Sequence, residues 1–108
     1  MIDWSHIDEL RQDMGEAFEE VVDVFLQEVE EGIAKLEQGA PPEALAANLH
    51  FLKGAALNLG FEQFAALCGD GENKANAGQA GSVDLAAVKR SYEVSRQEFT
   101  TGLQRRAA

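Results

Sequence analysis

The sequence contains few proline, cysteine and aromatic residues, and it has no long hydrophobic run. It holds two prolines and one cysteine, and aromatic residues make up 7% of it. Strand-forming residues never alternate with polar ones over a strand's length, which argues against a β-sandwich or barrel. No apolar stretch approaches the roughly 20 residues that span a bilayer, and no charged-then-apolar leader opens the chain. We therefore expect a soluble, cytoplasmic protein.

Cysteine usage and chain length set two further limits. The single cysteine, Cys68, cannot form an internal disulfide, which fits a reducing compartment. A chain of 108 residues fits one domain, so we expect residues 1–108 to form a single domain. Hydrophobic residues make up 45% of the sequence, which is enough for one core and argues against a disordered tail.

Acidic residues are concentrated in the first part of the chain. Residues 1–40 hold twelve acidic and two basic residues, whereas residues 41–108 hold seven of each. The net charge of −10 therefore comes from the first segment. The basic residues form no stripe that could release counterions from phosphates, so we expect no nucleic-acid binding. A solvated helix face is the simplest interpretation of the acidic segment.

Apolar residues recur at helical spacing along most of the chain. Ser5 followed by Asp8 predicts a capped short helix that Gly15 ends, with Trp4 packed over the end of the bundle. A second helix is expected from residue 16 to residue 38, where Gly39 stops it. The next helix can start at the two prolines, because its first positions need no amide donor, and it is expected to end near Leu59.

Two more helices complete the predicted fold. The fourth, over residues 61–75, contains Gly69 and Gly71, each of which costs about 1 kcal/mol relative to alanine in a helix interior. The sequence leaves open whether these glycines break the helix. Residues 78–81 are expected to form a loop, and Ser82 to cap the last helix. Five such helices with short connections predict an all-α fold, an antiparallel four-helix bundle with a short N-terminal leading helix.

The third predicted helix has an unusual exposed face. At about 100° per residue its leucines share one sector, and His50 lies nearly opposite them, with Lys53 one turn away. Small and apolar residues surround His50 where a solvated face would carry Glu, Lys and Gln, and such a surface favours close approach by a partner. An exposed histidine without a function is the alternative. The candidate docking residues are Ala46, Ala47, Gly54 and Leu57.

The fourth predicted helix carries an acidic residue on its apolar face. Glu72 continues the helical series of Phe61, Phe64 and Cys68. Because burying an unpaired carboxylate is expensive, Glu72 needs a hydrogen-bond partner, or else the helix frays and leaves it in water. We expect Cys68 to be a small core residue rather than a nucleophile, and His6 to be a surface residue rather than a metal ligand.

These residues form one specific motif. It is L-H-F-L-K-G-A-A-L-N-L-G at residues 49–60, followed by Leu67-Cys68 and Glu72. The motif resembles that of histidine-containing phosphotransfer (HPt) domains, and the similarity extends along nearly the whole chain. Two departures stand out: Gly71 replaces an apolar residue before the acid, and Ala55-Ala56 replace a small hydroxyl pair. The matching residues are His50, Lys53, Gly54, Gly60 and Glu72.

The resemblance implies that His50 carries a phosphoryl group. Glu72, by accepting a hydrogen bond from Nδ1, would fix the tautomer that leaves Nε2 free to attack phosphorus. Lys53 would neutralise phosphoryl oxygens, and Gly54 would leave room for the phosphate and for docking loops. The implied partners are response-regulator receiver domains and a histidine kinase or hybrid kinase. Mg²⁺ would come with the receiver, so we expect no cofactor and no metal in this chain.

Two other functional classes remain open. One is a non-phosphorylated helical adaptor or inhibitor that binds receivers or kinases, and the intact His50 argues against it. The other is a dimeric histidine phosphotransferase with a degenerate kinase-like domain, and the lack of a second domain argues against that. A G-x-x-x-x-G-K-[ST] loop is absent, so we do not expect an enzyme that uses ATP. Because no extra domain is attached, we expect a freestanding, monomeric phosphoryl carrier.

Overall fold

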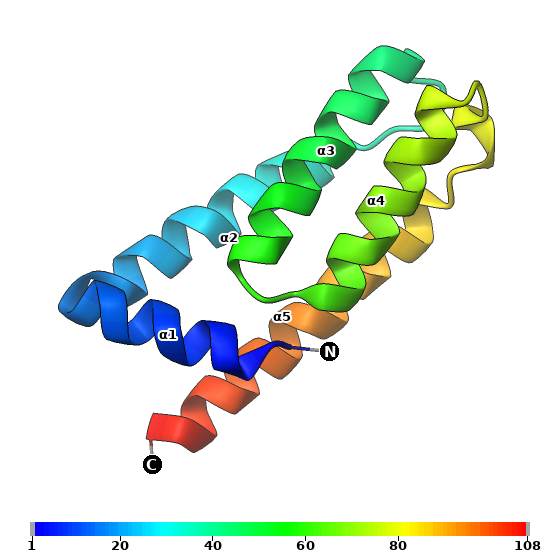
Figure 1. The fold of residues 1–108 in the computed structure, drawn as a ribbon. Helices are drawn as coiled ribbons and strands as arrows, with labels where there is room; N and C mark the ends of the chain where they lie inside the picture. The colour runs from blue at the N-terminus through cyan, green and yellow to red at the C-terminus, as the bar shows by residue number, and fades with distance from the viewer. Residues whose placement is uncertain (1, 108) are drawn as a thin grey trace.

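The computed structural model describes residues 2–107, which form five α-helices joined by short connections (Figure 1). Four of them, α2 to α5, pack side by side along a molecule measuring 46 × 20 × 20 Å, and α1 lies across one end beside the last turns of α5. This confirms the predicted all-α bundle with a short leading helix. The helices are α1 (Trp4–Met14), α2 (Phe18–Ala34), α3 (Pro42–Asn58), α4 (Glu62–Asn76) and α5 (Leu85–Ala107), with short 3₁₀ turns at Gly15–Ala17 and Ala80–Ser82.

The apolar stripes of the helices meet in one core. Burial of each large apolar side chain stabilises the fold by about 1.5–3 kcal/mol. This gain outweighs the free-energy cost of placing glycines in helix interiors. Aromatic rings concentrate where α4 meets α5: the ring centroids of Phe61 and Phe99 lie 5.4 Å apart, as do those of Phe64 and Tyr92. The largest fully buried side chains include Phe61, Phe64, Phe99, Ile7, Leu49, Leu52 and Leu59.

The cap of α1 differs from the prediction. Asp3, and not Ser5, caps the helix, because its Oδ1 accepts a hydrogen bond from the His6 backbone N–H at 3.2 Å. The two residue types are equally good caps, so tertiary contacts decide between them. The Asp3 backbone N–H donates to the Gly60 carbonyl at 2.8 Å, which fixes the chain at Asp3 as it enters the helix. Gly60 has a φ of +72°, a conformation that glycine adopts without strain.

The cap of α5 also differs from the prediction. The Asp84 carboxylate accepts a hydrogen bond from the Ala87 backbone N–H at 3.0 Å and takes the place expected for Ser82. Ser82 instead donates its hydroxyl to the Gln79 carbonyl at 2.8 Å within the preceding turn. Because that turn is a 3₁₀ segment, the helix begins later than the serine suggests.

The second helix is shorter than the spacing of its apolar residues predicts. It ends at Ala34 instead of residue 38, and the following amides of Lys35 and Leu36 bond three residues back, at 3.2 and 3.0 Å. Leu36 is nevertheless buried. A tightened last turn therefore keeps the apolar series going after the α-helix has ended, which is why periodicity overestimates its length.

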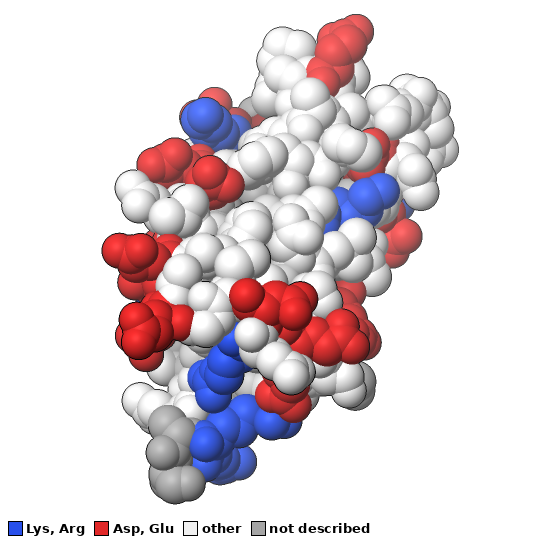
Figure 2. All heavy atoms as spheres, turned by 60° about the vertical axis from the view of Figure 1, so that its left-hand side comes forward, with Lys and Arg blue, Asp and Glu red and all other residues white. Residues whose placement is uncertain are grey.

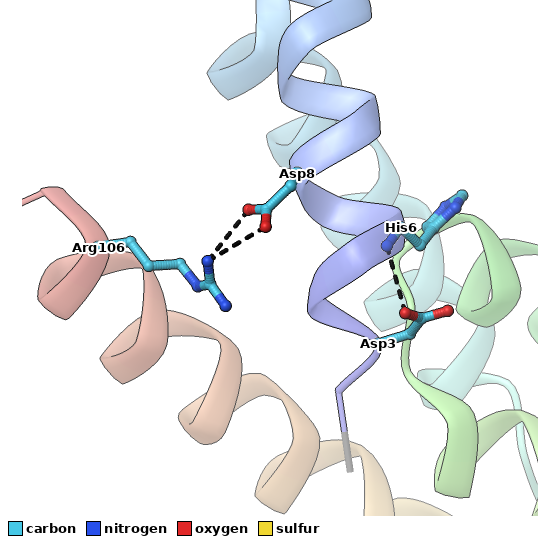
Figure 3. A network of polar contacts seen from close by, with 4 residues as sticks. All are labelled: Asp3, His6, Asp8 and Arg106. Carbon is cyan, nitrogen blue, oxygen red and sulfur yellow. Dashed lines mark hydrogen bonds and ion pairs between the residues drawn. The ribbon is translucent and has the colours of Figure 1, made fainter.

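Aromatic and charged groups fasten α1 to α5. The Trp4 ring stacks on Phe99 with centroids 6.0 Å apart, and the Arg106 guanidinium lies 4.4 Å from the Trp4 ring centroid. Arg106 also binds the Asp8 carboxylate at 3.1 Å (Figure 3). This agrees with the prediction that Trp4 packs over the bundle end. We call these contacts, made by Trp4 and Asp8 with Phe99, Gly102 and Arg106, the α1–α5 contact.

Charge is unevenly distributed over the surface. Figure 2 shows acidic side chains around a broad strip without charged side chains, and basic side chains gathered near one end of the molecule. Arg105 and Arg106 belong to the last turn of α5, where positive charge complements the helix dipole. Within α3, Glu43 and Lys53 are the acidic and basic residues, so this helix contributes mainly uncharged surface.

Candidate functional site

The exposed face of α3 carries His50. Its side chain is 69% exposed, and Ala47, Gly54 and Leu57 are exposed on the same helix. The placement of Ala46 on this face was wrong, because Ala46 is only 8% exposed. Ala46 precedes Lys53 by seven residues and therefore shares its flank, which faces α4. The packed neighbouring helix covers a methyl group there, whereas the long side chain of Lys53 extends past it.

An exposed phenylalanine adds to this face. Phe51 follows His50 directly, lies off the buried leucine stripe and is 45% exposed. A hollow of about 260 Å³ beside it is lined by residues of both α2 and α3, among them Glu28 and Asn48. The prediction did not include Phe51. Its position outside the series of inward leucines is the signal that identifies it.

The two glycines of α4 do not break the helix, which runs without interruption from Glu62 to Asn76. Gly71 is buried, and a Cβ at this position would lie 3.0 Å from Leu49 Cδ1 and 3.1 Å from Val83 Cγ1. Val83, from the connection between α4 and α5, thus fills the space beside Gly71. Close packing of helices and loop overrides the poor helix propensity of glycine at this point.

His50 and Glu72 meet across the seam between α3 and α4. Because α4 stays helical, Glu72 projects into this seam with its side chain 17% exposed. The His50 Nδ1–H donates a hydrogen bond to Glu72 Oε2 at 3.0 Å. A carboxylate accepts only, so this bond selects the tautomer protonated on Nδ1. The other ring nitrogen, Nε2, then carries a lone pair and points away from Glu72 on a largely exposed ring.

The second oxygen of Glu72 faces a lysine. Lys53 Nζ lies 3.4 Å from Glu72 Oε1, and the Lys53 side chain is 37% exposed. Oε1 itself is buried and accepts no hydrogen bond of good geometry. The ion pair with Lys53 is therefore the compensation that the structure provides for this desolvated oxygen. One oxygen of the Glu72 carboxylate thus contacts His50 and the other contacts Lys53.

The other candidates lie outside this group. Cys68 is buried in the core, as predicted, and burial raises the pKa of its thiol to about 12, so it is a neutral thiol at physiological pH. His6 is half-buried, and its Nε2–H donates to the Asn58 carbonyl at 2.8 Å (its α1 neighbours appear in Figure 3). Within residues 2–107, no cluster of three or more His, Cys, Asp or Glu side chains could hold a metal ion.

Comparison with known proteins gives the family. A family model of the Hpt domain matches residues 20–105, which include α3, α4 and both partners of the His50–Glu72 hydrogen bond. The chain belongs to the Hpt domain family. Hpt domains are phosphocarrier modules of two-component phosphorelays, which interact with receiver domains and kinases, and are not classical enzymes. No curated protein and no solved structure gave a significant match.

The family match also bears on the ends of the chain. α1 lies before the matched residues, so the α1–α5 contact joins a helix outside the matched segment to the last helix of that segment.

No helix in the described part of the chain is both long and apolar enough to cross a membrane.

Proposed function

We propose that this Hpt domain carries a phosphoryl group on His50 Nε2, between receiver-domain aspartates or from a histidine kinase to a receiver. The observation that carries the proposal is the 3.0 Å hydrogen bond from His50 Nδ1 to Glu72 on a ring that is 69% exposed. The bond holds the nucleophilic tautomer, and the exposure gives a partner access to Nε2.

The transfer follows from this geometry. The Nε2 lone pair attacks the phosphorus of an aspartyl phosphate; the N–P bond forms while the P–O bond breaks, and the aspartate leaves as a carboxylate. The ring proton stays on Nδ1, so the phosphorylated ring is cationic. Glu72 Oε2 already lies against that proton and stabilises the charge without reorganisation. Transfer to the next receiver reverses these steps.

Lys53 supplies positive charge in this scheme. Its ammonium rests on Glu72 Oε1 and can shift on its flexible stem toward phosphoryl oxygens once they arrive at the ring. The Glu72 carboxylate then balances the imidazolium. The role of Lys53 is thus purely electrostatic, whereas Glu72 both orients the ring and balances its charge.

The partner docks on the face around His50. Ala47, Gly54 and Leu57 keep it free of long charged side chains, and Phe51 adds exposed apolar area. A Cβ at Gly54 would meet no atom within 4 Å. Packing inside this protein therefore gives no reason for a glycine there, which supports a role in making room for phosphate and for a partner.

Residues 1–108 act as one domain, supported by a single core cluster that runs from Ile2 to Phe99. The protein works as a cytoplasmic monomer and brings no cofactor of its own. Mg²⁺ is held by the acidic pocket of the receiver, which suits a hard cation that prefers carboxylate oxygens.

Labelling tests the proposal directly. Incubated with phosphorylated receiver domains of its own organism and Mg²⁺, the protein should take up a label that survives alkali and is lost in mild acid, as expected of a phosphoramidate. His50→Gln should abolish the label and change the stability by less than about 0.5 kcal/mol, because the site is exposed. His6→Gln is the matched control and should be labelled normally. Acid-stable label, or label in His50→Gln, would refute the assignment, and receiver binding without label would indicate an adaptor.

A further inference from the structure

Gly69 occupies a specific position beside the Lys53–Glu72 ion pair. It lies one turn before Glu72 on α4, and the atom that a Cβ added there would meet is Lys53 Cδ. A Cβ at this position would lie 3.3 Å from that carbon, which is closer than ordinary van der Waals contact. The Lys53 stem thus passes directly over the glycine on its way to Glu72.

The conformation of α4 does not require glycine at this point. Gly69 lies in the interior of an uninterrupted helix, and no positive φ is found there. Alanine would favour the helix more. Gly71, two residues later, is explained by core packing against Leu49 and Val83, whereas the contact of Gly69 is with a functional side chain at the surface.

The path of Lys53 matters because Glu72 Oε1 is buried and has no well-formed hydrogen bond. Its compensation comes from Lys53 Nζ at 3.4 Å. A lysine stem pushed away from α4 would withdraw the ammonium and leave this oxygen desolvated and unpaired. The carboxylate would then turn toward water, and the hydrogen bond that orients His50 would be lost with it.

We propose that Gly69 is a positioning residue for phosphotransfer: the absence of a side chain lets Lys53 lie against α4, which holds Glu72, and through it His50, in place. This inference rests on the proposed function. Gly69 lines a groove of about 390 Å³ between α3 and α4 together with Lys53, Leu57 and Ala66. The lysine stem forms part of the wall of this groove.

Gly69→Leu tests this role, with Ala66→Leu as the control. Ala66 is exposed, lines the same groove and lies one turn further from Glu72, so the control places the same leucine side chain in the groove away from the ion pair. Gly69→Leu should slow transfer roughly tenfold, since sub-ångström to ångström misplacement of reacting groups has effects of this order or larger. Ala66→Leu should leave the rate within about twofold of wild type, and thermal unfolding should show both variants folded.

A double-mutant cycle separates positioning from obstruction of the partner. In a Lys53→Ala background the stem is absent, so Gly69→Leu should cause no further loss. A tenfold loss that persists in this background would overturn the proposal and assign the effect to docking.

A readout without phosphotransfer keeps this inference distinct from the proposed function. The ¹⁵N signals of the His50 ring report its tautomer, and Gly69→Leu should convert the wild-type Nδ1–H pattern to a mixture, the same result that is expected for Glu72→Ala. Unchanged ring signals in Gly69→Leu would overturn the inference even if wild-type protein transfers phosphate. Altered signals in a protein that takes no label would instead refute the proposed function alone.

Discussion

Among the helix contacts built over a glycine, the contact between α1 and α5 at Gly102 and the contact between α3 and α4 at Gly69 differ in the side chain that the glycine accommodates. Trp4 of α1 lies over Gly102 of α5, where an added Cβ would overlap the indole ring. Lys53 of α3 lies over Gly69 of α4, where a Cβ would lie 3.3 Å from the lysine stem. A rigid ring cannot yield, whereas a flexible stem can move by a few tenths of an ångström.

The α1–α5 contact holds the fold together, whereas the α3–α4 contact at Gly69 arranges the reacting groups. The aromatic stacking of the α1–α5 contact removes apolar surface from water, so its disruption should appear as lost stability. The α3–α4 contact places a lysine against a carboxylate at the surface, so its disruption should appear as slower transfer. Stability and rate should therefore respond to different substitutions.

The largest expected effect on stability is that of Gly102→Ala. Overpacking costs 1–3 kcal/mol, partly offset by a gain of about 1 kcal/mol in helix propensity, and loss of the Trp4–Phe99 stacking adds to the cost, so a net loss of about 2 kcal/mol is expected. Urea unfolding measures the loss, and the fluorescence of Trp4, the single tryptophan, should shift toward that of an exposed indole. Phosphotransfer well below the unfolding midpoint should stay at the wild-type rate.

In the matched control, the effect of Gly102→Ala on stability should change sign. In a Trp4→Ala background there is no ring to displace, so the same substitution should stabilise the protein by up to about 1 kcal/mol through helix propensity. Destabilisation in that background would show that a neighbour other than Trp4 requires the glycine.

The next effect is that of Glu72→Ala on transfer. Removal of the carboxylate frees the ring to exchange tautomers and removes the charge that balances the phosphorylated imidazolium, so transfer should slow by roughly 10- to 100-fold. His50 should still accept label, because the carboxylate positions the nucleophile but does not create it. Single-turnover transfer from a phosphorylated receiver measures the rate.

Glu72→Gln divides these two contributions. Its amide oxygen can still accept from His50 Nδ1–H, so the ring should keep its tautomer while the charge is lost. An intermediate rate with wild-type ¹⁵N ring signals is expected. Equal rates in wild type, Glu72→Ala and Glu72→Gln would show that the carboxylate has no part in transfer.

The periodicity of apolar residues predicted the bundle and the helix faces on which the site residues lie. The leucines of α3 repeat at three- and four-residue steps, so the opposite position of His50 follows from helix geometry alone. Glu72 on the buried side of α4 followed in the same way. The helix caps at Asp3 and Asp84 did not, because serine and aspartate compete equally there and tertiary contacts decide.

The glycines and Ala46 mark the limit of sequence-based reasoning. Helix propensity predicts a weak α4, but Gly71 is required by the approach of Leu49 and Val83, which come from other elements. Ala46 lies on a flank whose burial depends on how closely α4 packs. Neither fact is local to the helix that carries the residue, so only the assembled bundle reveals it.

The smallest expected effect concerns the ion pair within the α1–α5 contact. Asp8 and Arg106 are both exposed, and an exposed pair contributes less than about 1 kcal/mol, so Asp8→Asn should lower stability by about 0.5 kcal/mol or less, and by still less in high salt. Arg106→Ala should cost more, because the guanidinium also lies over the Trp4 ring at 4.4 Å, a contact worth about 0.5–1 kcal/mol at exposed sites. Urea unfolding at low and high salt distinguishes the two, since only the Asp8 contribution depends strongly on ionic strength. Equal losses for both variants that vanish together in salt would show that charge, and not the stacked ring, holds α1 against α5.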